Sequence, residues 1–389
     1  MLLSCAGLVG LAIDRKVIGA PSWRVTGSSG PNLQALDAAM RQFMENQRVT
    51  AGQLAIHVNG ALALNRGYTN AAMRPTVEPA SLFRIASCSK IFTCAAIEEL
   101  RASGRLKMNE RVFPLLGIQE PALPRRRPDP RINEITVQQL VNHAGGWVAG
   151  GPFVAQNGER VEGSNFDPVF QIRRMSLELG LSRPLSKLDM ARYMYGMPLQ
   201  FTPGTQNYNS THGHSYSNFG YVLLGLVVEK VAGMTYVDFL RSGPLNRDGT
   251  EDVFLAHTRA DQRLPREVWY EAAARGPDAL LPRSNILVPN PYGGEGFVTE
   301  CMDSGGGLAT TAATLASFIS KHAVWGMGGR APGYEREGSM AGTDSYAFSR
   351  PNGVDCAWII NTRNFPGGPQ AYQGFVKYLR NLLDSTPFA

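Results

Sequence analysis

Ser87 and Lys90 lie three residues apart at the start of a segment whose apolar residues recur at helical spacing. On a helix, two such side chains share one face, with Cβ atoms roughly 5–6 Å apart. The lysine can take the proton of the serine hydroxyl, and a helix N-terminus favours developing negative charge. The spacing therefore predicts an activated serine nucleophile. The alternative is a serine that only caps a helix, because a Ser-x-x-Lys pair is expected by chance about once in a chain of this length.

Tyr216 and Asn218 stand two positions apart, just before the apolar segment 221–231. A phenol near a cation can have its pKa lowered and then serve as a base. An amide beside it can hydrogen-bond the carbonyl of an acyl group. These residue types fit a serine nucleophile that needs partners from a distant part of the chain. The same Tyr-x-Asn pattern occurs at 68–70, where we expect it to be structural.

The elements that must position these residues follow from periodicity and turn signals. Apolar spacing predicts an amphipathic helix over 33–47, and Asn59-Gly60 between apolar runs predicts a hairpin of strands 52–58 and 61–64. Near the end of the chain, 339–349 and 354–361 read as a second hairpin, followed by a helix over 375–383. Helical patterns fill the middle, and the segments 21–31 and 280–296 read as a linker and a loop near the site mouth. The middle helices are expected at 136–141, 169–179, 221–231 and 310–322.

Bulk composition is that of an ordinary globular protein of 389 residues, with 43% hydrophobic and 18% charged residues. The net charge of +6 is modest, and the only dense basic run, Arg125-Arg126-Arg127, is flanked by prolines. We therefore expect a solvated loop there and no nucleic-acid partner.

The cysteines and histidines give no sign of a metal or cofactor, and the N-terminus gives no sign of a membrane span. The five cysteines show no metal or disulfide spacing, and His212 and His214 lack a third ligand at a suitable spacing. The apolar run 2–13 is too short to span a bilayer and leaves cytoplasmic, periplasmic and secreted locations open. We expect no cofactor, no metal and no membrane span, and oligomeric state stays open.

Taken together, the chain resembles the serine β-lactamase-like superfamily, which includes class C β-lactamases, DD-peptidases and family VIII carboxylesterases. The similarity runs over roughly 33–383. Its motifs are Phe83-Arg-Ile-Ala-Ser-Cys-Ser-Lys90, Leu140-Val-Asn-His143-Ala-Gly-Gly146, Pro203-Gly204 with Tyr216 to Tyr221, and Gly306-Gly307-Leu308-Ala-Thr-Thr311. The resemblance implies an α/β plus all-α, β-lactamase/transpeptidase-like fold: an antiparallel sheet built from both chain ends, flanked by helices, with an inserted helical lobe.

The third catalytic motif departs from the superfamily pattern. Where relatives carry Lys-Thr-Gly or His-x-Gly, this chain has Arg336-Glu-Gly338-Ser339. Arginine keeps the positive charge but is bulkier and has a fork geometry, whereas Gly338 lets a substrate approach the backbone closely. This departure argues against efficient turnover of β-lactams or peptidoglycan and leaves acyl transfer possible.

The resemblance implies a mechanism and a division of the chain. Ser87 is the nucleophile, Lys90 and Tyr216 move its proton, and the backbone N–H groups of Ser87 and Ser339 form the oxyanion hole. Which of Lys90 and Tyr216 is the base is left open. Asn218 orients the acyl side, while Trp147 lines the acyl pocket or belongs to the core, as do Phe153, Tyr292 and Phe297. The domains expected are an arm and linker over 1–30 and a hydrolase domain over 31–389, with a sheet lobe (31–75 and 300–389) and a helical lobe (76–299).

Hydrolysis of small carboxylic esters is the first functional hypothesis. The alternatives are amide hydrolysis, as in a β-lactamase, DD-peptidase or D-amino-acid amidase, and acyl transfer to an alcohol. A catalytically inactive binding protein on the same scaffold is disfavoured by the complete Ser87, Lys90 and Tyr216 set. A Ser-His-Asp hydrolase of the α/β class is disfavoured because Ser87 lacks the Gly-x-Ser-x-Gly turn, and His143 reads as part of a structural turn.

Overall fold

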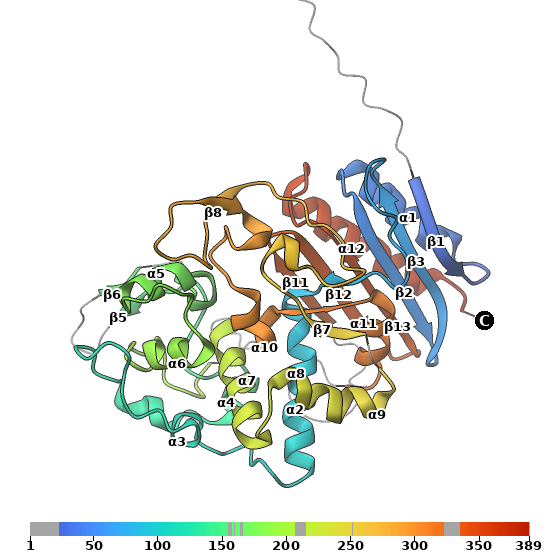
Figure 1. Ribbon diagram of the computed structural model, residues 1–389. Helices are drawn as coiled ribbons and strands as arrows, with labels where there is room; N and C mark the ends of the chain where they lie inside the picture. Colours follow the sequence, from blue (N-terminus) through green and yellow to red (C-terminus); the bar gives the residue numbers. More distant parts are fainter. Residues whose placement is uncertain are drawn as a thin grey trace, which may run out of the picture.

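Strands from both ends of the chain pair in one antiparallel six-stranded sheet, in the order β1-β3-β2-β13-β12-β11 (Figure 1). The computed structural model describes residues 23–154, 158, 160–163, 166–206, 215–250, 252–322 and 335–388. The strands are β1 (Trp23–Ser29), β2 (Ala51–Val58), β3 (Ala61–Asn70), β11 (Glu335–Met340), β12 (Thr343–Ser349) and β13 (Val354–Ile360). The predicted β-lactamase-like architecture, with a sheet assembled from both chain ends, is confirmed.

Helices cover both faces of this sheet. On one face lie α1 (Gln34–Asn46) and α12 (Gly368–Ser385), joined by a cluster that includes the stacked rings of Phe43 and Phe375. The other face is covered by α11 (Ala312–Ile319), whose Phe318 stacks on Phe92 of the long helix α2 (Ser89–Ala102). Two cores of apolar side chains thus sandwich the sheet, and α2 begins at its inner face.

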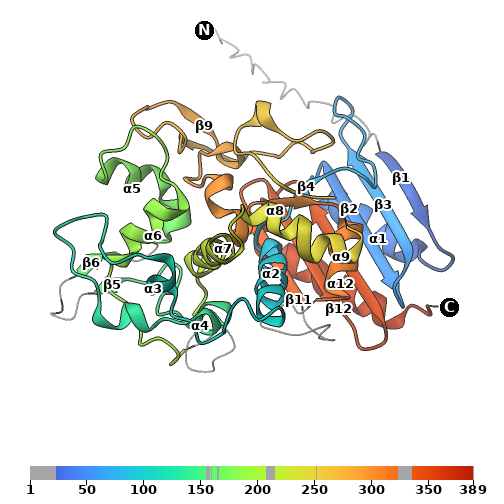
Figure 2. The same cartoon turned by 60° about the horizontal axis from the view of Figure 1, so that its bottom comes forward.

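A largely helical region lies on the far side of α2 from the sheet (Figures 1 and 2). Its centre is α7 (Asn218–Ala232), which packs on α2 and on the short helix α10 (Asp303–Gly306). Ser217 caps the N-terminus of α7, and Gly233 ends the helix with φ of 73°. The helix predicted over 221–231 therefore begins three residues earlier than expected. The remaining helices there are α3 (Val112–Leu116), α4 (Val137–Val141), α5 (Ile172–Glu178) and α6 (Lys187–Tyr195). After α7, the chain continues beside α2 through α8 (Tyr236–Leu240), a π-helical turn at Arg241–Leu245 and α9 (Asn246–Asp248).

Short strands and 3₁₀ turns complete the described chain. The strand pairs are β4 (Phe83–Arg84) and β7 (Val253–Leu255) on either side of β10 (Leu308–Thr310), β5 (Phe153–Val154) with β6 (Arg160–Glu162), and β8 (Arg275–Pro277) with β9 (Leu287–Pro289). The 3₁₀ turns are η1 (Ala86–Cys88), η2 (Pro130–Glu134), η3 (Pro168–Phe170), η5 (Ala260–Gln262), η6 (Asn290–Tyr292) and η7 (Thr299–Met302). Among the described residues, none of the helices has both the length and the apolar character needed to cross a bilayer.

Two expectations about local structure were wrong. The segment 21–31 is not simply a linker, because Trp23–Ser29 pairs with β3 along its whole length as an edge strand. The segment 339–349 is not one strand: the chain turns at Ala341-Gly342, where Gly342 has φ of 84°, and separates β11 from β12. Glycine adopts a positive φ without a steric penalty, so Gly342 was a turn signal that the sequence-based prediction did not use. The apolar run 2–13 lies outside the described residues.

Candidate active site

Ser87 lies on a tight turn between the sheet and α2. The turn is η1, and its preceding residue Ile85 donates its N–H to the carbonyl of Leu308 at 3.0 Å. Ala86 has φ of +43°, an unfavourable conformation for a residue with a Cβ atom. The neighbouring contacts that hold this turn therefore present the Ser87 side chain just before the N-terminus of α2.

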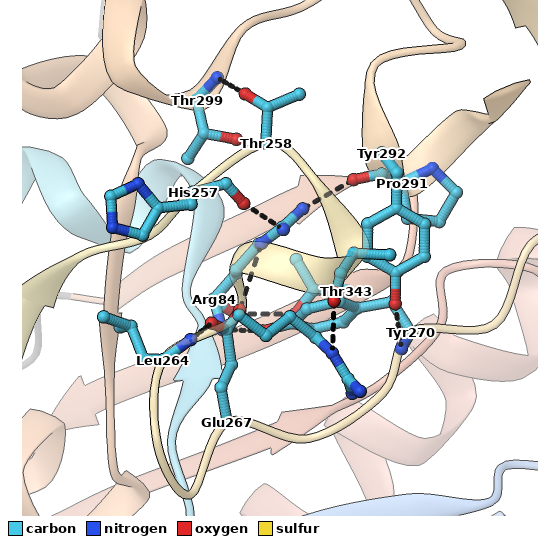
Figure 3. Close-up of polar contacts among 12 residues, drawn as sticks. Arg84, His257, Thr258, Leu264, Glu267, Tyr270, Pro291, Tyr292, Thr299 and Thr343 are labelled. Carbon is cyan, nitrogen blue, oxygen red and sulfur yellow. Dashed lines mark hydrogen bonds and ion pairs between the residues drawn. The ribbon is translucent and has the colours of Figure 1, made fainter.

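A buried arginine anchors the strand that leads into this turn (Figure 3). The Arg84 guanidinium pairs with Glu267 at 3.3 Å and donates to the carbonyls of Pro291 and His257, each at 2.5 Å. The Arg84 backbone is also held, since its N–H bonds the Tyr270 hydroxyl and its carbonyl accepts from Thr343. One side chain thus ties several segments to the strand just before the nucleophile. The Phe-Arg pair was read only as a motif, and this anchoring role was not predicted. 

Lys90, the second residue of α2, is fully buried. Its ammonium nitrogen lies 3.0 Å from Ser87 Oγ and 2.9 Å from Asn218 Oδ1, and it also donates to the carbonyl of Gly305. Burial holds the pKa of Lys90 well below its usual value, and the positive charge of Arg336 lowers it further. Lys90 is therefore placed and tuned to accept a proton from Ser87.

Tyr216 closes the triad from the segment before α7. Its hydroxyl lies 2.7 Å from Ser87 Oγ, and Lys90 Nζ lies 5.1 Å from the centre of its ring. Burial raises the pKa of Tyr216, although Arg336 and the hydrogen bond with Ser87 oppose the rise. The sequence-based expectation of a lowered pKa was wrong because removal from water outweighs the nearby cation. A neutral phenol is suited to hand on a proton.

Asn218 joins Lys90 to a carboxylate that the sequence analysis missed. Its Nδ2 donates to Asp167 Oδ2 at 2.7 Å, while its Oδ1 accepts from Lys90. Asp167 is buried, and burial raises its pKa against the hydrogen bonds it accepts from Asn218 and the backbone of Val169. Asn218 is not among the residues that line the cavity at Ser87. Its described contacts position Lys90, and a contact with the acyl group stays a prediction.

His143 packs against Tyr216, within the turn where it was predicted to have a structural role. Its φ is +56°, its Nδ1 accepts the backbone N–H of Ser217 at 3.1 Å, and its ring stacks on Tyr216 with centroids 4.6 Å apart. Burial holds its pKa well below the usual value, and Arg336 and Lys90 lower it further. A neutral imidazole thus fixes the backbone at Ser217 and the ring of Tyr216.

The edge strand β11 brings the remaining predicted residues to Ser87. Arg336 is buried, and its Nε donates to the carbonyl oxygen of Ser87 at 3.1 Å. At Gly338, a Cβ atom would lie 2.3 Å from the Ile85 carbonyl and 2.9 Å from the Cys88 nitrogen. Glycine is therefore required at 338 because the turn that carries Ser87 packs directly against β11. From the sequence, Gly338 was expected only to let a substrate approach the backbone.

A cavity of about 370 Å³ opens over the nucleophile. It continues towards a second cavity of about 420 Å³ between β11, β12 and α12, with which it shares Glu335, Glu337 and Tyr346. The first cavity is lined by Ser87, Tyr216, Glu335, Arg336, Glu337, Ser339 and Tyr346. The two glutamates, which flank Arg336 on β11, and Tyr346 on β12 were not singled out from the sequence.

Trp147, like Asn218, is a predicted binding residue that does not line the cavity at Ser87. It is buried in the core, edge-on to Phe113 and Phe219, and does not line the space beside Ser87. Phe153 and Phe297 are also buried core residues. These aromatics therefore belong to packing, which was the alternative left open.

Metal and thiol chemistry find no support in the described residues. No group of three or more His, Cys, Asp or Glu among them is arranged to hold a metal ion, and His212 and His214 fall outside the described part of the chain. Cys88 is buried beside the nucleophile, where burial raises the pKa of its thiol to about 12. It is a packed, protonated side chain.

Comparison with known proteins identifies the relatives of this site. A family model described as Beta-lactamase matches residues 36–375. "Protein flp" of Staphylococcus aureus (strain COL) is 23% identical over 272 residues, which cover 67% of this chain and 45% of that protein. The chain therefore spans less than half the length of this curated relative.

Solved structures show the same fold at low identity. The D-amino acid amidase from Ochrobactrum anthropi SV3 superposes with a TM-score of 0.57 and 18% identity, covering 89% of this chain and 99% of that one. EstCE1, described as a hydrolase with promiscuous acyltransferase activity, gives a TM-score of 0.60 and 15% identity, with 90% and 98% covered.

Proposed function

The chain belongs to the beta-lactamase family, and we propose that it is a serine hydrolase that acts on small carboxylic esters through an acyl-enzyme on Ser87. The single observation that carries the proposal is the contact of Ser87 Oγ with Lys90 Nζ at 3.0 Å and with the Tyr216 hydroxyl at 2.7 Å. A nucleophile within hydrogen-bonding reach of a base and of a proton donor is the arrangement that covalent acyl transfer needs.

In the proposed acylation, Ser87 Oγ attacks the ester carbonyl carbon and its proton passes to Lys90. Lys90 is the better base because its pKa is lowered, whereas that of Tyr216 is raised. As the bond to the leaving alcohol breaks, the alcohol oxygen takes a proton through Tyr216, which is resupplied from Lys90. Water then attacks the acyl group, the carboxylic acid leaves, and Ser87 recovers its proton.

The oxyanion that forms during each attack needs fixed donors. We assign this role to the backbone N–H groups of Ser87 and Ser339, because both residues line the cavity and β11 packs directly against η1. Such a donor typically contributes about 2.7–4 kcal/mol to transition-state stabilisation. Arg336 holds the Ser87 carbonyl, which lies in the peptide unit that follows the Ser87 N–H on the same turn.

The charge of the cavity favours neutral esters over substrates that carry a carboxylate. Glu335 and Glu337 line it together with Arg336, and Arg336 is already engaged with the Ser87 carbonyl. Glu335 pairs with Arg380 at 2.6 Å, whereas Glu337 forms no ion pair among the described residues. A carboxylate at the cavity wall repels an anionic ligand, and β-lactams and peptidoglycan stem peptides both end in a carboxylate.

Amide hydrolysis is the second candidate. A neutral phenol 2.7 Å from Ser87 Oγ can protonate a leaving amine, which departs poorly without a proton. The fold similarity to a D-amino acid amidase points to the same possibility.

A substrate panel with one active-site label tests the proposal. p-Nitrophenyl esters from acetate to octanoate are compared with nitrocefin and D-alanine p-nitroanilide, using wild type and Ser87→Ala. We expect ester turnover to exceed the other two by at least about tenfold in kcat/KM, and the alanine variant to be inactive. Mass spectrometry should locate a fluorophosphonate label on Ser87. Faster turnover of the anilide would replace the ester assignment with amide hydrolysis, and a label elsewhere would reject the nucleophile.

A further inference from the structure

Asp167 is a buried carboxylate whose two oxygens receive different donors. Oδ2 accepts Asn218 Nδ2 at 2.7 Å, and Oδ1 accepts the backbone N–H of Val169 at 3.2 Å, at the start of η3. Its side chain is not in contact with Ser87. Among the described residues, it is linked to the nucleophile through Asn218 and Lys90, a chain of three hydrogen bonds of 2.7, 2.9 and 3.0 Å.

The carboxylate fixes which way the Asn218 amide points. An ionised carboxylate only accepts hydrogen bonds, and an amide has one accepting oxygen and one donating nitrogen. The nitrogen of Asn218 must therefore face Asp167, which turns its oxygen towards Lys90. Without that acceptor, the two amide orientations would differ little, because either amide end can bond a neutral amine.

The orientation of the amide in turn decides what Lys90 presents to Ser87. A neutral amine has two hydrogens and one lone pair. The Lys90 nitrogen faces three groups, and two of them, Asn218 Oδ1 and the Gly305 carbonyl, can only accept. Both hydrogens are used there, and the third neighbour, the Ser87 hydroxyl at 3.0 Å, can donate. The lone pair is left for the proton that must be removed.

We propose that Asp167 is a positioning residue for acylation, which holds the Asn218 amide with its oxygen towards Lys90 and so directs the lysine lone pair at Ser87. The inference rests on the proposed function, since it takes Lys90 as the base. If the amide turned over, its Nδ2 would donate to the lone pair, and the base would be blocked without any change in the substrate cavity.

The charged and titratable groups around Lys90 come from several elements, and they set the sign of a pH effect. Arg336 lowers the pKa of Lys90, and Asp167 raises it. Removing the Asp167 charge should therefore lower the pKa of Lys90. The charged and titratable neighbours of Lys90 are Arg336 on β11, Asp167 before η3, His143 after α4, Tyr216 and Tyr221 around the start of α7, and Cys88 and Cys94 around α2.

Asp167→Ser tests the proposal, and Asp129→Ser is its matched control. Serine can still cap η3 at Val169, but it lacks the second oxygen that Asn218 uses. Asp129 caps η2 in the same way, has little exposed surface, and is followed by Pro130 as Asp167 is by Pro168. It pairs with Arg131 and is not among the residues that line the cavity at Ser87. Asp167→Asn is the second variant, because Val169 and Asn218 donate to different oxygens of Asp167 and the asparagine amide puts a donating NH2 in the place of one of them. Thermal unfolding confirms that each variant folds.

We expect Asp167→Ser to lower kcat for p-nitrophenyl butyrate at least about tenfold with KM within about threefold, whereas Asp129→Ser stays within about twofold of wild type. The acidic limb of the kcat/KM profile should move to lower pH, a shift that a purely structural loss would not produce. In an Asn218→Ala background, Asp167→Ser should change kcat by less than about twofold, because the residue acts through the amide.

Two results would overturn the proposal: equal kcat in the Asp167 and Asp129 variants with an unmoved acidic limb, or a full Asp167→Ser effect in the Asn218→Ala background. The rate at which a fluorophosphonate labels Ser87 separates this outcome from failure of the proposed function. The labelling rate measures how strongly Ser87 is activated, whatever the natural substrate of the enzyme is. Normal labelling of wild type, without ester turnover, would reject the ester assignment and still allow the Asp167 variants to be compared.

Discussion

The Nε–H of Arg336 donates to the carbonyl oxygen of Ser87 at 3.1 Å, so the cation of the edge strand is held on the backbone of the nucleophile. Its guanidinium also lies 5.7 Å from the centre of the Tyr216 ring. This position makes Arg336 the leading electrostatic influence on both proton-transfer groups after burial. The departure from the superfamily pattern at 336 thus preserves a positive charge that acts on Lys90.

Replacing Arg336 by methionine should raise the pKa of Lys90, because the cation that destabilises its protonated form is gone. A base works only when deprotonated, so the acidic limb of the kcat/KM profile should move to higher pH. At pH 7 we expect turnover to fall about tenfold or more, with partial recovery at alkaline pH. The measurement is the pH profile of ester hydrolysis. Arg101→Met, at an exposed ion pair on the same helix as Lys90, should leave the limb in place, and an unmoved limb in Arg336→Met would contradict the argument.

Tyr216→Phe removes the hydroxyl 2.7 Å from Ser87 Oγ while keeping the ring stacked on His143. Because burial keeps this phenol protonated, its loss should matter most where the leaving group needs a proton. We expect kcat/KM for an ethyl ester to fall at least about a hundredfold. The p-nitrophenyl ester of the same acid should lose less, since p-nitrophenolate departs unprotonated. Equal losses for both esters would argue for a role other than proton donation, and a near-normal rate would remove Tyr216 from the mechanism.

The residues that carry motifs could be predicted from the sequence, because their chemistry depends on short spacing. Ser87 and Lys90 lie three residues apart, and Tyr216 precedes an apolar helix that must be buried. The fold implied by the order of the motifs was therefore enough to predict that these three side chains lie together. The hairpin β2–β3 was visible for a similar reason, since Asn59-Gly60 fixes the turn locally.

Residues whose role depends on tertiary contacts could not be found this way. Asp167 lies 51 positions before Asn218 in a polar stretch, and Asp-Pro there reads only as the start of a turn. Trp147 shows the opposite failure, since a large aromatic beside a glycine turn reads the same in a pocket as in a core. The sign of the Tyr216 pKa shift was missed because burial, which no spacing encodes, outweighs the nearby cation.

Gly338→Ala should damage both stability and activity. The added methyl would meet the Ile85 carbonyl at 2.3 Å and the Cys88 nitrogen at 2.9 Å, and these backbone atoms carry the nucleophile turn. Overpacking of this kind typically costs about 1–3 kcal/mol. Equilibrium unfolding in urea measures the loss, and ester turnover at a temperature where the variant stays folded measures the displacement of Ser87. The control is Gly374→Ala on α12, where nothing lies within 4 Å of the new atom and stability should be unchanged or gain up to about 1 kcal/mol. Equal stabilities for the two variants would show that β11 can move away from the turn.

Glu337→Gln should relax the discrimination against anionic substrates. The wild-type carboxylate lines the cavity at Ser87, and burial together with Glu335 raises its pKa. We therefore expect wild type to prefer p-nitrophenyl butyrate to mono-p-nitrophenyl succinate, and the variant to reduce this preference roughly three- to tenfold in kcat/KM.

Protonation of Glu337 removes the same charge, so the wild-type preference should narrow as pH falls, beginning at a higher pH than an ordinary glutamate would give. Salt should compress the ratio in wild type more than in the variant, because it screens a charge that only wild type carries. Asp384→Asn removes a carboxylate from the neighbouring cavity alone and should leave the ratio unchanged. A ratio that is insensitive to Glu337→Gln would place the anion barrier elsewhere and withdraw the electrostatic support for neutral esters.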